Sequence, residues 1–164
     1  MSATVTSPKT VTFHTFGEIE KLIQGFERGT LLRSEWTHCA HLTVACWYLV
    51  CYPVSEATRL IREGIQKYNN AVGIVTTRES GYHETMTLFW IRMVSSYLSQ
   101  VTLECSLVGL VNDLVDRYGN AHLPFEYYSR DRLMSWEARA DWVEPDLKPL
   151  PLIVDCRLLK AALQ

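Results

Sequence analysis

The segment from Ser34 to Cys51 constrains the fold more than any other part of this sequence. Tryptophan, leucine, valine, alanine and tyrosine follow one another along it, so that a helix formed here is apolar almost all the way round. Ser34 is a suitable N-terminal cap, and Pro53 stops the helix just beyond Cys51. A helix with so little polar surface must be covered on all sides. We therefore expect this helix at the centre of a helical bundle.

Apolar residues at helical spacing predict further helices on both sides of this segment. The sequence Thr15 to Glu18 has the form of a capping box at the start of the first of them. The expected helices cover about residues 16–28, 55–71, 82–99 and 104–118, with a short helix after Ser129. No stretch alternates polar and apolar residues for long enough to build a sheet. The sequence thus predicts an all-α, single-domain antiparallel helical bundle.

The two ends of the chain differ from this helical pattern. We expect residues 1–11, which are rich in serine and threonine, to be a disordered N-terminus, and residues 12–164 to be one helical domain. The segment 142–151 contains too many prolines for a helix and should lie extended across the bundle. Its four large apolar side chains should pack there: Trp142, Val143, Leu147 and Leu150. A last short helix is expected over residues 154–163.

Composition excludes several classes of function. The formal net charge is −2 and no run of lysine or arginine stands out, which argues against nucleic acid as a partner. The longest mostly apolar run, residues 44–54, is too short to span a membrane. The N-terminus lacks the pattern of a secretory signal, and the five cysteines contain no C-x-x-C pair. We expect a cytoplasmic protein with reduced thiols. Its oligomeric state is left open.

Three histidines and one glutamate form the predicted site. His38 and His41 are three residues apart, so they lie within roughly 60° of each other on one helix face, which is expected to point inward. His83 lies near the start of another helix and should also face the interior. Glu84 follows it, about 100° further round that helix. Metal sites in bundle cores are assembled in this way, from side chains on facing helices.

One hypothesis is therefore a metal-dependent enzyme that acts on a small organic substrate. His38, His41 and His83 would hold one divalent ion, and Glu84 would be the catalytic base or a fourth ligand. Three protein ligands leave a coordination position open for water or substrate, and nitrogen and oxygen ligands suit Zn or Fe(II). The sequence lacks the second histidine of the H-E-x-x-H motif, so the spacing does not identify a known zinc site.

Two further hypotheses fit the same residues. In one, the protein is a non-enzymatic module that binds a small molecule within the polar cluster. Its predicted substrate-binding or ligand-binding residues are Tyr48, Tyr82, Thr87, Trp90 and Arg139, with Trp36 and Trp47 as further aromatic candidates for the wall. In the other, the protein is a structural or interaction bundle whose buried histidines satisfy one another. The first two hypotheses require a shared cavity, whereas the third does not.

Three sequence blocks resemble the motifs of a family of small, mostly bacterial helical proteins with no established activity. Residues 36–42 resemble W-T-H-x-A-H-L, and residues 81–87 resemble G-Y-H-E-T-I-T. Residues 135–151 resemble a block that ends in W-V-x-P-D-L-x-P-L-P. The likeness covers about residues 13–151 and places the histidines, Glu84 and Arg139 within its motifs. It implies no reaction, and the chain after about Val154 lies outside it.

Overall fold

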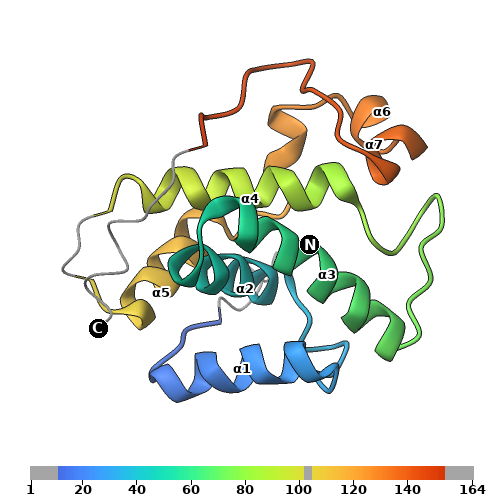
Figure 1. Cartoon of the computed structure of the whole chain (residues 1–164). Coiled ribbons are helices and arrows are strands. Elements are labelled where there is room, and N and C mark those ends of the chain that lie inside the picture. The colour runs from blue at the N-terminus through green and yellow to red at the C-terminus, as the bar shows by residue number, and fades with distance from the viewer. Residues whose placement is uncertain (1–10, 102–104, 154–164) are drawn as a thin grey trace, which may run out of the picture.

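The computed structural model describes residues 11–101 and 105–153 of the chain. These residues form seven α-helices and one short 3-10 helix, and none of them forms a strand. The elements are α1 (Phe16–Arg28), α2 (His38–Cys51), α3 (Val54–Ala71), α4 (Glu84–Leu98), α5 (Leu107–Tyr118), η1 (Leu123–Glu126), α6 (Arg130–Leu133) and α7 (Trp136–Ala140) (Figure 1). The predicted all-α fold is confirmed.

Helix α2 occupies the centre of the molecule, as its composition predicted. It packs against α1, α3, α4 and α5 (Figure 1). Leu42, Thr43, Val44 and Ala45 follow one another along a full turn, and all four are buried. Because every side of α2 is covered, its apolar residues form the shared part of the hydrophobic core.

Three helices, α2, α4 and α5, begin later than the sequence predicted, and their caps explain why. Ser106 caps α5, because its hydroxyl accepts the backbone N–H of Gly109. Thr37 rather than Ser34 caps α2, because the Thr37 hydroxyl accepts the backbone N–H of Ala40. Helix α4 begins at Glu84, with His83 in the cap position instead of on the helix face. The imidazole of His83 takes the role of a capping oxygen. The later starts of α2 and α4 change the directions in which the side chains near those starts point.

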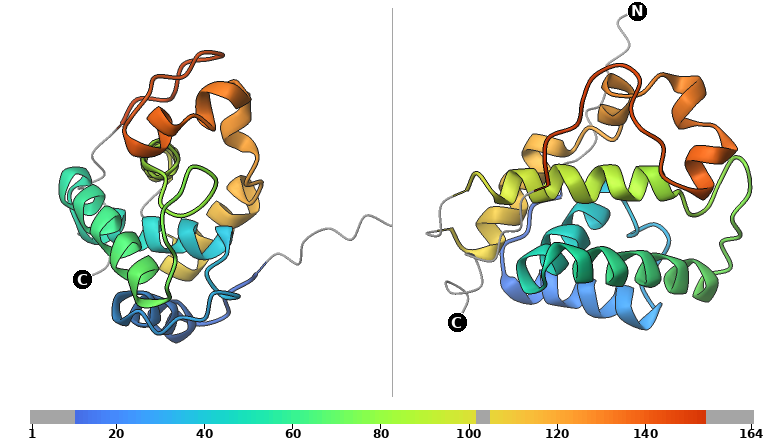
Figure 2. Two further views of the ribbon diagram at one scale, coloured as in Figure 1. Left: turned by 90° about the vertical axis from the view of Figure 1, so that its right-hand side faces the viewer. Right: turned by 45° about the horizontal axis from the view of Figure 1, so that its top comes forward.

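The C-terminal part of the described chain forms a second layer on α4, on the side away from α2 (Figures 1 and 2). It contains the predicted short helix α6, a further helix α7 that the sequence analysis did not predict, and the extended segment 141–153. Val143 is buried at 5% exposure and Trp142 is partly buried, whereas Leu147 is 57% exposed. The expectation that Leu147 packs on the bundle is therefore wrong.

The remaining predictions about the chain ends concern residues outside those described. The disordered N-terminus is predicted over residues 1–11, of which 1–10 lie outside the described residues, and the last short helix, predicted over 154–163, lies outside them entirely. Among the helices that the structure describes, none is both long enough and apolar enough to cross a bilayer.

Candidate functional site

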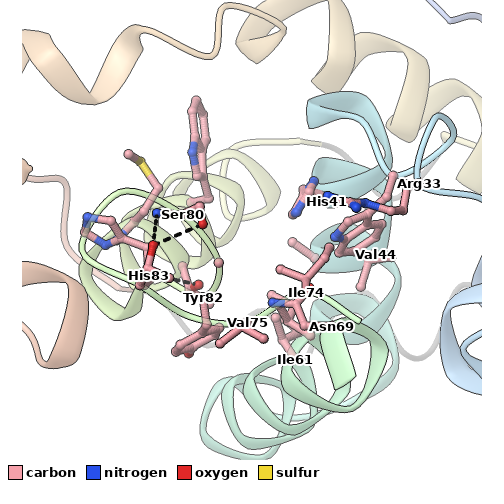
Figure 3. A pocket seen from close by; sticks show the side chains of 18 of the residues that line it. Arg33, His41, Val44, Ile61, Asn69, Ile74, Val75, Ser80, Tyr82 and His83 are labelled. Atoms are coloured by element: carbon pink, nitrogen blue, oxygen red, sulfur yellow. Dashed lines mark hydrogen bonds between the residues drawn. The ribbon is translucent and has the colours of Figure 1, made fainter. Parts of the chain in front are cut away.

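One cavity of about 640 Å³ lies where α2, α3 and α4 meet the loop between α3 and α4. Figure 3 shows His41 and Arg33 on one side of it and His83 and Tyr82 on the other, with Asn69 of α3 below His41, beside Ile74 and Ile61. Aliphatic and aromatic side chains form most of the wall. The volume falls within the range of small-molecule sites, roughly 300–1,000 Å³.

His41 is the histidine whose ring is best placed to meet a ligand. Its Nδ1 lies 2.7 Å from the carbonyl oxygen of Thr37, so Nδ1 carries the proton and donates it there. Its Nε2 then has a lone pair and makes no hydrogen bond within the described residues. The ring packs against Trp36, with ring centres 3.9 Å apart. Burial lowers the pKa of His41 to about 4, so the imidazole is neutral near pH 7.

His83 lines the opposite wall, but both of its ring nitrogens are used by the backbone. Nδ1 accepts the N–H of Met86 at 3.2 Å and thereby caps α4. Nε2 lies 2.9 Å from the carbonyl oxygen of Leu133, to which it donates. Burial lowers the pKa of His83, which keeps the ring in this neutral tautomer. His83 therefore joins α4 to α6 of the C-terminal layer.

His38 is not part of the cavity wall. Its Nε2 donates to the carbonyl oxygen of Tyr118 at 2.9 Å, which ties the start of α2 to the end of α5. Its ring lies against Trp90, with ring centres 4.4 Å apart. Burial lowers the pKa of His38 as well. The register of α2 thus directs His38 and His41 toward different neighbours.

Glu84 also lies outside the cavity wall. Its side chain, 12% exposed, accepts the hydroxyl of Tyr82 at Oε2, 2.6 Å away. Its Oε1 accepts Arg62 Nη2, which connects the start of α4 to α3. Both oxygens are engaged, so Glu84 positions the Tyr82 ring that faces the cavity.

The other predicted ligand-binding residues fall into two groups. Tyr82, Thr87 and Trp90 line the cavity. Tyr48 lies elsewhere on α2, where its hydroxyl donates to Glu27 Oε1 at 2.9 Å. Arg139 does not line the cavity either. Of the two further aromatic candidates, Trp36 lines the cavity and Trp47 packs against Phe16.

Arg139 acts on the cavity through the loop that closes it. The side chain is 5% exposed and donates to three backbone carbonyls of the loop, those of Arg78, Gly81 and Tyr82, at 3.1–3.3 Å. Gly81 has φ +88°, and a Cβ there would lie 2.6 Å from the Thr76 Cα, so the tight loop needs glycine at this position. Arg139 is therefore a positioning residue for the loop.

Asn69 and Arg33 line the cavity, and the sequence analysis did not select them. Asn69 is 7% exposed, and its side-chain amide makes no hydrogen bond with any described residue. It continues the inner stripe of α3 after Ile61 and Ile65, so a polar residue at an apolar position was the available signal. Arg33 lies in the linker before α2, where no periodic pattern singles it out.

The described residues contain no group of three histidine, cysteine, aspartate or glutamate side chains close enough to hold one ion. The reason is geometric: His41 and His83 share the cavity, but His38 turns away and both nitrogens of His83 are engaged. The three-histidine metal site stays a prediction, and this arrangement gives it less support than a ligand cavity. Comparison with known proteins identifies no relative: no protein-family model, no curated protein and no solved structure matches the chain.

Proposed function

We propose that this protein binds a small organic molecule in the cavity between α2, α3 and α4. The observation that carries the proposal is the side chain of Asn69, which lies in the cavity wall at 7% exposure and makes no hydrogen bond with any described residue. Its amide is not sealed inside the protein, because Arg62 Nε is the one fully buried side-chain nitrogen or oxygen without a partner among the described residues. A ligand in the cavity can therefore exchange hydrogen bonds with the amide, which explains a polar residue at this position of the inner stripe.

The chemistry of His41 supports binding more than acid–base catalysis. A general base is most effective when its pKa lies near the working pH. Burial lowers the pKa of His41 to about 4, so its Nε2 is a weak base but a permanent hydrogen-bond acceptor near neutrality. With Asn69 it provides two polar contacts in a largely apolar site, which is the usual composition of a small-molecule pocket.

The proposal is tested with N-phenyl-1-naphthylamine, a neutral aromatic probe whose fluorescence increases in apolar surroundings. We expect saturable binding to the wild type. Ile65→Trp places a larger ring in the cavity and should abolish this binding. Leu60→Trp makes a comparable change on the same helix, outside the cavity, and should leave it intact.

Circular dichroism establishes that each variant is folded, and Met86→Trp blocks the cavity from α4 if Ile65→Trp does not fold. Absence of saturable binding to the wild type would contradict the proposal. Binding to a folded, blocked variant with unchanged affinity would also contradict it, because the probe would then lie elsewhere on the protein.

A further inference from the structure

We propose that the ligand of this cavity is a small aromatic acid. It has a flat apolar body, one anionic group that pairs with Arg33, and one hydroxyl or N–H group that donates to Nε2 of His41. This inference rests on the proposed function, since it specifies the chemistry of the molecule that occupies the same cavity.

The anionic group follows from the charges around the cavity. Arg33 is the one charged side chain among the described residues that line it, and no carboxylate lines it. Within those residues Arg33 forms no ion pair, although the chain pairs Arg59, Arg62 and Lys148 with glutamates elsewhere. Arg33 is exposed, so it meets a ligand where the cavity opens to solvent. A guanidinium in this position favours a carboxylate or a similar planar anion.

The donor group follows from the tautomer of His41. Because Nδ1–H donates to the Thr37 carbonyl, Nε2 is an acceptor and cannot donate while the ring is neutral. A ligand that presents only acceptors would place its lone pairs against that of Nε2. A hydroxyl or N–H group on the ligand completes the hydrogen bond. The amide of Asn69 can donate and accept, so it adapts to either kind of ligand atom.

The aromatic body follows from the shape of the wall. Trp36, Trp90 and Tyr82 contribute aromatic rings from three directions, namely the linker before α2, α4 and the loop before α4. Aromatic side chains attract other aromatic rings in stacked or edge-on arrangements. The Trp36 ring is itself held between Phe26, 4.9 Å away, and His41, so its position is fixed before a ligand arrives. A preformed aromatic wall selects a rigid ring over a flexible chain.

Three matched compounds separate the two polar requirements. 4-Hydroxyphenylacetate has the anion and the donor, 4-hydroxyphenylacetamide lacks the charge, and 4-methoxyphenylacetate lacks the donor. Affinities are measured by isothermal titration calorimetry at neutral pH and low salt. We expect the first compound to bind about three- to tenfold more tightly than either of the others, as one charge-assisted contact or one hydrogen bond allows. Added salt should reduce the difference in affinity between 4-hydroxyphenylacetate and the uncharged amide, and should leave the difference from the methoxy compound unchanged.

Variants assign each preference to its residue. Arg33→Gln should remove the preference for the acid over the amide, while Arg28→Gln, at an exposed arginine outside this cavity, should not. His41→Met should remove the preference for the hydroxyl over the methoxy compound. His41→Gln should keep it, because the glutamine oxygen supplies an acceptor near the position of Nε2.

Equal affinities of the acid and the amide would overturn the inference, and so would equal affinities of the hydroxyl and methoxy compounds. It would also be overturned if none of the three compounds bound. An equal effect of Arg28→Gln and Arg33→Gln would overturn it as well. The neutral probe keeps this failure separate from that of the proposed function. If N-phenyl-1-naphthylamine still binds the wild type and Ile65→Trp still blocks it, the cavity binds a ligand but the ligand is not an aromatic acid.

Discussion

Asn69 illustrates how a single residue can reveal a site. Its neighbours on the inner stripe of α3, Ile61 and Ile65, contribute to the core by burying apolar surface. The Asn69 amide in the same stripe makes no hydrogen bond within the described residues, and its polar atoms meet the cavity instead of a protein partner. Leucine at position 69 would serve the stability of the fold better than asparagine, so the presence of Asn69 indicates a ligand.

Asn69→Leu should raise stability and weaken ligand binding at the same time. Leucine has the same branched shape, although it is larger, and it adds apolar surface to the inner stripe, so we expect the free energy of unfolding to rise by about 1 kcal/mol. The affinity for 4-hydroxyphenylacetate should fall. Asn70→Leu makes the same change at the exposed neighbouring position and serves as the control. Chemical denaturation and calorimetry measure the two effects; a destabilised Asn69→Leu variant would show that the amide has a structural partner after all.

Two half-buried histidines, His38 and His41, and the buried His83 predict how stability depends on pH. Burial lowers the pKa of His41 from 6.5 to about 4, and it lowers those of His38 and His83 too. Below pH 6.5 the unfolded chain therefore binds protons that the folded chain does not, and unfolding becomes easier. For His41 the loss accumulates as the pH falls from 6.5 to about 4, at a slope of up to about 1.4 kcal/mol per pH unit.

His41→Gln should make this slope shallower, since glutamine takes up no proton. Two other groups near His41 carry charge or titrate. His38 lowers the pKa of His41 further, and Arg33 lies on the same side of the cavity. His14→Gln, at an exposed histidine, is the control. Urea unfolding at a series of pH values, with chelator present, provides the measurement. An unchanged slope in His41→Gln would mean that this imidazole titrates normally in the folded state.

At the level of elements, the sequence predicted helices well and their starts less well. Apolar periodicity placed α1 and α3, because a 3.6-residue repeat is a property of the sequence itself, and an unbroken apolar run that ends before Pro53 placed the central α2. The side chain that caps a helix depends on local competition instead, and Thr37 prevailed over Ser34. An imidazole cap at His83 is outside the usual set of capping residues, so the sequence did not indicate it.

The same distinction explains the predicted site. His41, His83, Tyr82, Thr87 and Trp90 were predicted and do line one cavity, because each follows an inward stripe or flanks one. The direction of His38 and the partners of Glu84 depend on which helix lies opposite, and periodicity carries no information about that. Arg33 is in a linker with no repeat at all. Tertiary packing decided these positions.

The conformation of the loop between α3 and α4 depends on hydrogen bonds from Arg139 of α7. Arg139→Met should remove the donors that hold the carbonyls of Arg78, Gly81 and Tyr82, and should cost about 2 kcal/mol of stability. We expect faster amide hydrogen exchange in residues 73–82 and weaker binding of the neutral probe, with α1 unaffected. Arg130→Met, at an exposed arginine on α6, is the control. Unchanged exchange in the loop would show that Arg139 does not hold it.

At the scale of the whole molecule, the C-terminal layer is connected to the cavity at two points. His83 of the cavity wall donates to Leu133 at the end of α6, and Arg139 of α7 holds the loop that closes the cavity. The extended segment adds a third connection to α4, through Thr85 to the backbone of Asp141 and Val143. The layer therefore supports the site from outside, although none of its described residues lines the cavity.

Metal removal tests whether the three histidines act together. His38 and His83 bond different carbonyls, Tyr118 and Leu133, so we expect His38→Ala and His83→Ala to lower stability additively. We also expect chelator to leave the wild type unchanged. Denaturation of protein purified without a His tag, with and without chelator, measures both. A chelator-sensitive wild type with strongly non-additive losses would instead support one shared ion.

Truncation tests how much the extended segment contributes to the whole fold. Ending the chain after Ala140 removes Val143, which is 5% exposed, and the carbonyl that accepts the hydroxyl of the fully buried Tyr128 at 3.0 Å. Burial of a valine side chain contributes about 1.5–3 kcal/mol, so together with this hydrogen bond the loss should lower the melting temperature by about 5–10 °C. The reference is a chain that ends after Ile153, so that the two proteins differ only in residues 141–153. Equal melting temperatures would mean that the segment lies on the bundle without stabilising it.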